Sequence, residues 1–283
     1  MKHDGMKKLA GDFMSSLASL VKVTLMSKMA FPSGGEGKEK AIVIMGNGPS
    51  LRKTIDEKID RLESNDLMAV NFAANTPDFL RLRPKYYVLA DGHFFNGADR
   101  DANVRELWEN ISAVTWKMTL LIPLKYIHFA KVFLMNSGNV ELQGFNLTPI
   151  EGFGWLKRML FNLGAGMPRP RNVMIPAIMC AIRLGYGKIY LCGADHTWTK
   201  TLDVDDENFV ISIQPHFYKD NKIEADRVRE TYRGIKLHEV LESMTVAFRS
   251  YWEIAGYAGK KGVEIINATP GSMIDAFPKK EIS

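Results

Sequence analysis

Apolar residues recur in short blocks that predict a series of β-strands. A near-continuous apolar run over 41–46 is typical of a central strand that is buried on both faces of a parallel sheet. Similar runs predict further strands over 67–71, 85–91, 188–193 and 263–267. Their length and their content of branched and aromatic residues favour strands over helices.

Stretches with helical spacing of apolar residues separate these strands. They predict helices over 51–62, 102–111, 172–184 and 238–258. Because strand and helix alternate along the chain, we expect a Rossmann-like α/β fold with a mostly parallel sheet and helices on both faces.

The middle of the chain is less regular. Residues 113–121 and 130–135 have strand-like composition. Glycine and proline are frequent over 142–169, which predicts loops around a short helix at 155–163.

The first forty residues differ from the rest, so we divide the chain into an N-terminal segment, 1–40, and a main domain, 41–283. Residues 6–29 predict an amphipathic helix, and the glycine-rich stretch that follows predicts a linker. Its apolar stripe and its opposing polar stripe are Leu9, Phe13, Leu17 and Leu20, and Lys8, Ser15, Ser19 and Lys22. Such a helix could lie on the anionic surface of the inner membrane, pack on the domain, or pair with a second subunit in a homo-oligomer.

A long charged segment, 197–237, has few aliphatic clusters. A segment of this length inside a compact domain is usually functional, which predicts a lid. It contains the acidic run 203–206 (DVDD), which looks like an acidic metal-binding motif. Because that motif normally follows a strand, we interpret this run as a solvated loop and expect no metal site.

The composition narrows the classes of function. The 283 residues are 46% hydrophobic with a formal net charge of +5, which excludes a disordered chain and fits an enzyme for anionic substrates. Without a basic run that contains aromatic residues, nucleic acid is not an expected partner. Cys180 and Cys192 have no metal-ligand spacing, so a reducing, cytoplasmic location is expected. We expect neither a signal peptide nor a membrane-spanning segment.

The strongest motif is GNGPS, which follows the first predicted strand. Gly46 and Gly48 would let the backbone approach a ligand, with Asn47 between them. Ser50 begins a helix whose free N–H groups favour a phosphate. A plain strand-to-helix turn is the other interpretation.

Polar residues also end three other predicted strands. They are Asn71, Asp91 and Asp195. Open α/β sheets bind ligands beyond the carboxyl ends of their strands, so these side chains could contact a base, a ribose or an acceptor. Each of them could equally cap a loop.

At this point the motifs resemble a known family, the bacterial lipooligosaccharide sialyltransferases of glycosyltransferase family 42. The resemblance lies in GNGPSL, in the asparagine that ends the second strand, and in the block LGYGKIYLCGAD at 184–195. It covers 41–91 and 171–195, and polysaccharide-locus and flagellin-modifying proteins share the GNGPSL signature. It implies a modified Rossmann domain of the GT-A-like kind, a mobile lid, a CMP-sugar donor, inversion, and no metal or other cofactor.

The resemblance also implies roles for individual residues. Asn47 and Asn71 would contact the donor nucleotide or its phosphate, and Arg171 and Asn172 would contact the donor. The family's general base is a histidine at the start of the last long helix, a place that His238 occupies.

Two departures from the family pattern concern the sugar. This chain has Asp91 where the family has asparagine, and HTW at 196–198 where the family has a tyrosine that steadies the leaving phosphate. Tyr218 and Tyr232, in the predicted lid, could replace that tyrosine.

Several histidines compete with His238 as the base. His216 lies in the predicted lid, and His196 follows Asp195, whose carboxylate could fix its tautomer. His93 follows the third strand. A packing or capping role is the alternative for each of them.

These observations lead to one hypothesis and two alternatives. The hypothesis is an inverting, metal-independent glycosyltransferase that moves a sialic acid or related 2-keto sugar acid from a CMP-sugar to a glycan or glycolipid acceptor at the cell surface. The first alternative is a Mg²⁺-dependent pyrophosphokinase-like enzyme, in which 203–206, or Asp91 with Asp195, would bind the metal. The second is a non-catalytic scaffold of a polysaccharide assembly complex.

Overall fold

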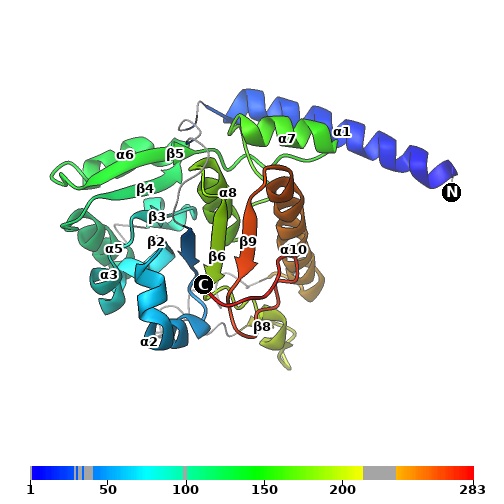
Figure 1. Ribbon diagram of the computed structural model, residues 1–283. Coiled ribbons are helices and arrows are strands. Elements are labelled where there is room, and N and C mark those ends of the chain that lie inside the picture. Colours follow the sequence, from blue (N-terminus) through cyan, green and yellow to red (C-terminus); the bar gives the residue numbers. More distant parts are fainter. Residues whose placement is uncertain (1, 29, 31–33, 35–40, 98–100, 213–233) are drawn as a thin grey trace.

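The computed structural model describes residues 2–28, 30, 34, 41–97, 101–212 and 234–283. Its centre is a seven-stranded sheet with the order β5-β4-β3-β2-β1-β6-β9, in which every neighbouring pair is parallel (Figure 1). The strands are β1 (Ile42–Met45), β2 (Asp66–Val70), β3 (Tyr86–Val88), β4 (Met118–Pro123), β5 (Val140–Phe145), β6 (Lys188–Cys192) and β9 (Glu264–Asn267).

Helices connect the strands, and a small antiparallel hairpin lies outside the sheet. The helices are α1 (Lys2–Met26), α2 (Ser50–Glu63), α3 (Pro77–Leu82), α4 (His93–Asn96), α5 (Ala102–Ser112), α6 (Ile127–Phe133), α7 (Gly154–Asn162), α8 (Met174–Arg183) and α10 (Leu237–Lys260), with the 3₁₀ turns η1 (Asn71–Asn75), η2 (Leu124–Tyr126) and η3 (Trp198–Lys200). The hairpin pairs β7 (Leu202–Val204) with β8 (Val210–Ser212).

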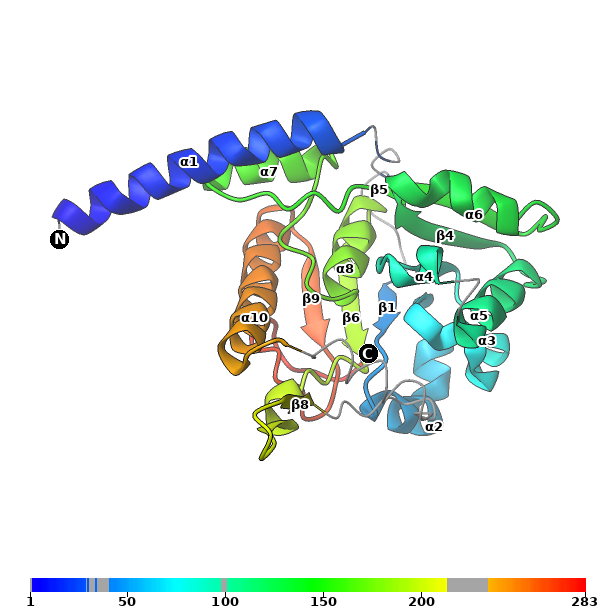
Figure 2. The same cartoon turned by 180° about the vertical axis from the view of Figure 1, so that it is seen from behind.

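Both faces of the sheet are covered, as the uninterrupted apolar run of β1 predicts. Because successive side chains of a strand point to opposite faces, Ile42 and Ile44 pack with α7, α8 and α10. Val43 and Met45 pack with α2, α3, α5 and α6 on the other face. All four side chains are at most 4% exposed. The expected Rossmann-like α/β fold is therefore confirmed, and Figure 2 shows it from behind.

The irregular middle of the chain departs from the sequence-based prediction in two places. Residues 130–135 are not a strand, because Phe129 and Phe133 of α6 pack against the ring of Trp108 at helical spacing. The strand is instead β5, Val140–Phe145, whose last four residues fall in the stretch 142–169 that was expected to be mostly loop. β5 is an edge strand with only Phe145 and Gly144 buried, so it lacks the apolar run of a central strand.

Candidate functional site at the carboxyl ends of the strands

The order of the strands creates a crevice. Connections from β1 run through β2 to β5 on one side, whereas β6 and β9 lie on the other side of β1. Loops that leave β1 and β6 therefore diverge, which is where open α/β sheets bind ligands. A cavity of about 410 Å³ lies there. Its walls are residues 46–49, 71–72, 90–91, 93–94, 147, 170–174, 193, 195–198 and 201.

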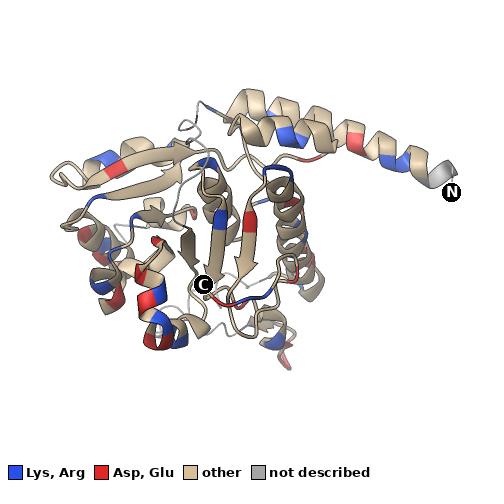
Figure 3. Ribbon diagram, viewed as in Figure 1, with Lys and Arg blue, Asp and Glu red and all other residues tan. Residues whose placement is uncertain are grey.

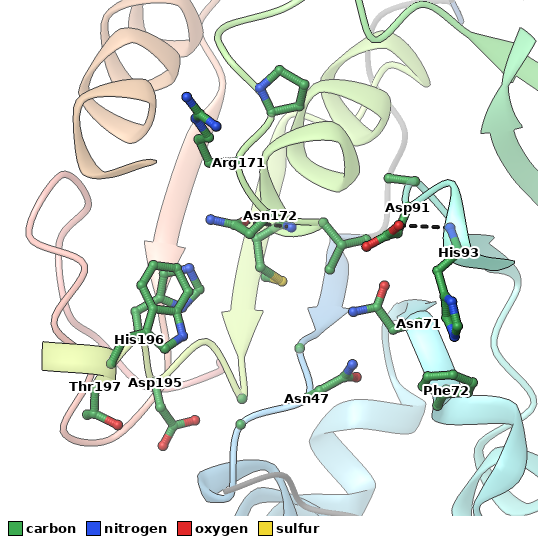
Figure 4. Close-up of a pocket in the computed structure, with 18 of the residues that line it drawn as sticks. Asn47, Asn71, Phe72, Asp91, His93, Arg171, Asn172, Asp195, His196 and Thr197 are labelled. Carbon is green, nitrogen blue, oxygen red and sulfur yellow. Dashed lines mark hydrogen bonds between the residues drawn. The ribbon is translucent and has the colours of Figure 1, made fainter. Parts of the chain in front are cut away.

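The cavity brings together residues that are far apart in the sequence. Asn47, Asn71 and Asp91 follow β1, β2 and β3, and Figure 4 shows them on one side. Arg171, Asn172, Asp195 and His196 lie on the side of α8 and β6 (Figure 4). Gly46 and Gly48 also line the cavity.

The two glycines of the GNGPS turn are required by packing between two loops. The N–H of Gly46 donates to the carbonyl of Cys192 over 2.7 Å, and that of Gly48 donates to the carbonyl of Gly193 over 2.8 Å. A Cβ added to Gly46 would lie 2.5 Å from the Gly193 oxygen, and one added to Gly48 would lie 1.9 Å from Asp195 Oδ2. The turn thus joins β1 to the loop after β6.

The start of α2 has an anionic partner within the protein. Ser50 is the first residue of α2, and its hydroxyl donates to Asp195 Oδ2 over 2.7 Å. Its N–H points to Asp195 Oδ1 at 3.4 Å. A carboxylate already occupies the favourable end of the helix dipole, so a phosphate would meet a like charge there. Burial raises the pKa of the Asp195 carboxyl, opposed by its hydrogen bonds from Ser50.

Asn172 is held with its amide nitrogen unused. Its Oδ1 accepts from the N–H of Met174 over 3.0 Å and from the Tyr251 hydroxyl over 2.9 Å. Two donors on one atom fix the orientation of the amide. Nδ2 of Asn172, like Oδ1 of Asn47, is buried and has no hydrogen-bond partner among the described residues. Since buried polar groups normally have a partner, both atoms point to a ligand or bound water.

His196 supports Asn172 through Tyr251. Nε2 of His196 lies 2.6 Å from the Tyr251 hydroxyl. Because that hydroxyl donates to Asn172, it must accept from His196, which places the proton on Nε2 and the lone pair on Nδ1. Burial, with 8% of the residue exposed, lowers the pKa of the His196 imidazole to about 3. Such a weakly basic imidazole is better suited to positioning than to removing a proton.

Two of the four described non-glycine residues with a positive φ line the cavity. Asn71 has a φ of 51° and His196 a φ of 53°, in the left-handed region that side chains rarely adopt. The Tyr87 hydroxyl donates to the Asn71 carbonyl over 2.5 Å and helps to hold that conformation. Strained residues cluster at functional sites, because the surrounding structure must stabilise them.

The third strand adds a carboxylate and an imidazole. Asp91 Oδ1 accepts from the N–H of His93 over 2.9 Å. Nε2 of His93 lies 2.8 Å from Asp101 Oδ2, which holds the ring. Both Asp91 and His93 line the cavity.

Arg171 supplies a positive charge to the cavity wall. Its side chain is exposed, and none of the described carboxylates forms an ion pair with it. A guanidinium in this position could bind an anionic ligand through two parallel hydrogen bonds.

Other residues that the sequence suggested lie elsewhere. His238 is exposed at the start of α10 and is not part of the cavity wall. Asp205, in the acidic run, accepts hydrogen bonds from the N–H groups of Glu207 and Phe209 at the tip of the β7–β8 hairpin. His216, Tyr218 and Tyr232 lie outside the described residues.

Tyr251 is the residue that sequence reasoning missed. It lies in α10, 79 positions from Asn172, and no motif marks it. Only its spacing within the apolar stripe of α10 is visible in the sequence, and that spacing predicts a core residue.

The fold and the cavity define a Rossmann-like α/β protein with a ligand crevice at the point where the strand order reverses. No protein-family model matches the sequence, and no curated protein matches it. The resemblance to glycosyltransferase family 42 therefore depends on the motif residues alone.

The solved structures that are similar include that of the MAf glycosyltransferase from Magnetospirillum magneticum AMB-1. The TM-score is 0.49 and the sequence identity 11%, over 96% of this chain and 38% of that one. This chain thus spans well under half of that protein, and a similarity of this degree carries no information about activity.

Proposed function

We propose that the protein is an inverting glycosyltransferase that uses a CMP-activated sialic acid or related 2-keto sugar acid and a glycan or glycolipid acceptor. The observation that carries the proposal is the crevice itself, where Asn47, Asn71 and Asn172 surround a cavity of about 410 Å³. These are the positions that the resemblance to family 42 assigns to the donor. A cavity of this volume is in the range of small-molecule sites.

The wall residues suit such a donor. Amide groups both donate and accept, so Asn47 and Asn172 can pair with a pyrimidine edge or a ribose through their unpartnered atoms. Arg171 can neutralise the single phosphate of the leaving CMP, a role that donors can perform without a metal. Arg171 thereby fills the function for which Tyr218 and Tyr232 were candidates.

We retain His238 as the proposed general base. α10 leads into the parallel strand β9, so its first residue lies at the carboxyl edge of the sheet, as the cavity does. Val240 and Met244 pack with Val210 and Trp198, and Trp198 lines the cavity. Burial lowers the pKa of the His196 imidazole to about 3, which makes His196 the weaker candidate for the base.

A thermal-shift comparison of CMP, CDP, UDP, GDP and ATP tests the donor. Stabilisation by CMP above the diphosphates supports the proposal, because a CMP leaving group carries one phosphate. No stabilisation by any nucleotide would contradict it and would favour the scaffold alternative.

A substitution tests the base. We expect His238→Ala to bind CMP normally and to lose transfer by about 10²- to 10⁴-fold, the usual contribution of a general base. His128→Ala, which changes an exposed histidine of α6, should leave transfer unchanged. Undiminished transfer in the His238 variant would exclude that residue.

One observation favours the pyrophosphokinase-like alternative. Asp91 and Asp195 line the same cavity, whereas Asp203 and Asp205 on the hairpin do not. ATP binding by this protein tests the alternative. Binding that requires Mg²⁺, and that is lost on addition of EDTA and in the Asp91→Asn variant, would support the alternative over glycosyl transfer.

A further inference from the structure

The N-terminal helix docks on the domain through its serines. Ser19 is 1% exposed; its Oγ accepts from the N–H of Glu151 over 2.8 Å and donates to the carbonyl of Glu151 over 3.0 Å. Ser16 is 6% exposed, and its Oγ accepts from the N–H of Phe153 over 2.9 Å. Part of the polar side of this amphipathic helix therefore faces the protein.

The apolar side of the same helix faces outward. Nine large apolar residues of α1 are 42–79% exposed. They are Met6, Leu9, Phe13, Met14, Leu17, Leu20, Val21, Leu25 and Met26. α7 lies beside α1 in both ribbon views (Figures 1 and 2) and contributes exposed Trp155 and Met159, with Leu163 at its end. We call these twelve residues the α1–α7 apolar surface.

A surface of this kind is unusual for a monomer in water. Soluble proteins rarely expose a contiguous apolar patch that runs along a long helix. Of the described helices, one segment, Gly5–Met26, is long and apolar enough to cross a membrane, with only 11% of its 18-residue window buried. It is not an uninterrupted apolar run, because Lys7, Lys8, Asp12 and Lys22 lie within it.

The charges beside this surface indicate what covers it. α1 and α7 together contain six lysines or arginines against two aspartates. Lys7, Lys8 and Lys22 are on α1 and Arg158 is on α7, where Lys157 is paired with Glu253 of α10 over 3.2 Å. Figure 3 shows lysine and arginine residues on both helices in blue. An apolar face bordered by cations fits an anionic lipid surface, and exposed Trp155 is typical of the lipid–water interface.

The same charges argue against a second copy of the chain. A symmetric pair would bring the same surface of each copy together, and therefore the lysines of α1 close to those of its partner.

The hydrogen bonds of Ser16 and Ser19 also hold α1 along the domain, so a helix crossing the bilayer would have to break them.

We propose that the α1–α7 apolar surface lies in the headgroup region of an anionic membrane, with α1 parallel to the membrane plane. This inference goes beyond the proposed function and does not depend on it. The inference depends on the exposure of the leucines of α1 to solvent, which the amphipathic pattern of the sequence does not show.

Co-sedimentation of the full chain with vesicles tests the proposal. We expect binding to vesicles that combine phosphatidylcholine with phosphatidylglycerol, weaker binding to phosphatidylcholine alone, and release by high salt or alkaline carbonate. The double variant Phe13→Glu/Leu17→Glu should lose binding about tenfold or more, because two apolar contacts are removed and two negative charges are added.

A matched control shows whether a loss of binding comes from the position of the substitutions or from the two added negative charges. Leu80→Glu/Val132→Glu adds the same charge at exposed apolar residues of α3 and α6, 64% and 65% exposed, and should bind vesicles as the wild type does. Circular dichroism should confirm that both double variants are folded.

Four results would overturn the proposal. They are no binding by the wild type, equal binding by the Phe13→Glu/Leu17→Glu variant, resistance to alkaline carbonate, which indicates a spanning helix, and a dimer in light scattering that this variant dissolves. Vesicle binding is measured without nucleotide, so its failure is distinguishable from failure of the proposed glycosyl transfer.

Discussion

The cavity and the α1–α7 apolar surface arrange their side chains in opposite ways. At the cavity, loops beside a tightly packed apolar sheet carry polar groups such as Asn172 Nδ2, just before α8, which is buried and has no hydrogen-bond partner among the described residues. On α1, Ser16 and Ser19 point to the protein while Leu17 and Leu20 point away from it. The difference teaches that an amphipathic pattern identifies a helix without identifying which face the protein buries. Where the leucines face outward, the missing apolar partner must come from outside the domain.

The largest expected effect is on stability, through the packing of the two loops beside the cavity. Gly193 has a φ of 64°, and a Cβ there would lie 2.7 Å from the Gly46 carbonyl oxygen. We expect Gly193→Ala to lower the free energy of unfolding by about 3 kcal/mol, through overpacking and backbone strain. Urea denaturation measures this change.

The matched control is Gly187→Ala. Gly187 precedes β6, and a Cβ there would meet nothing within 4 Å. Its free energy of unfolding should stay within about 0.5 kcal/mol of the wild type. Equal stability of the two variants would refute the assignment of the Gly46–Gly193 contact as a packing constraint.

A second substitution tests whether the polar groups of the cavity face a ligand. Asn172→Asp keeps an acceptor for Met174 and Tyr251 but replaces the amide donors with a negative charge. CMP affinity should fall about 10- to 100-fold, the value of one or two hydrogen bonds to a charged group. Calorimetric titration measures it.

Asn162→Asp provides the control for that change. Asn162 Oδ1 also accepts two hydrogen bonds, from Tyr257 and Lys261, but it lies at the end of α7 outside the cavity. CMP affinity should be unchanged there. Equal losses in both variants would point to a general charge effect instead of a contact with Asn172.

The pH dependence of stability tests the buried state of His196. Its folded pKa of about 3 lies below the ordinary value of 6.5, so between these values the unfolded chain binds more protons than the folded protein. This contribution to stability is present above about pH 6.5 and is lost as the pH falls toward 3, with a slope approaching about 1.4 kcal/mol per pH unit.

Replacement of the imidazole isolates that contribution. The stability difference between the wild type and His196→Gln should shrink as the pH falls from about 7 to about 5, since glutamine does not titrate. Urea unfolding of both proteins at each pH provides the measurement. A pH-independent difference would show that His196 titrates normally in the folded state.

The smallest expected effect tests whether α1 faces the domain with its serines and solvent with its leucines. Ser19→Ala leaves the N–H of Glu151 without its acceptor, so the docking of α1 should weaken by about 1 kcal/mol and its amide exchange should become faster. Leu17→Ala should leave that exchange almost unchanged, because the residue is 49% exposed. The opposite ranking of the two variants would place the leucines against the domain.

Hydrophobic pattern was sufficient to predict the central strands and the long helices. β1 and β6 are four- and five-residue strands with nearly every side chain buried, so their apolar runs are unambiguous. α6 and β5 were predicted wrongly because a short apolar run fits a strand or a helix, and because an edge strand has one solvated face. In such segments tertiary contacts determine the element.

The residues of the candidate site divide in the same way. Asn47, Asn71 and Asp195 follow strands whose ends meet at one edge of a parallel sheet, so the alternation of strands and helices alone placed them together. The sequence could not show that Asp195 would occupy the start of α2, or that Tyr251 would connect His196 to Asn172. Those contacts join residues far apart in the chain.

The sequence by itself therefore determined the central strands, the long helices, the parallel sheet and the set of polar residues at its carboxyl edge, because periodicity and strand length are local properties. Only the tertiary structure decided that the glycines of GNGPS pack against Gly193, that His196 is buried and neutral, and that the leucines of α1 face outward. Each of these depends on which distant surface lies opposite a given residue, and no local pattern specifies that surface.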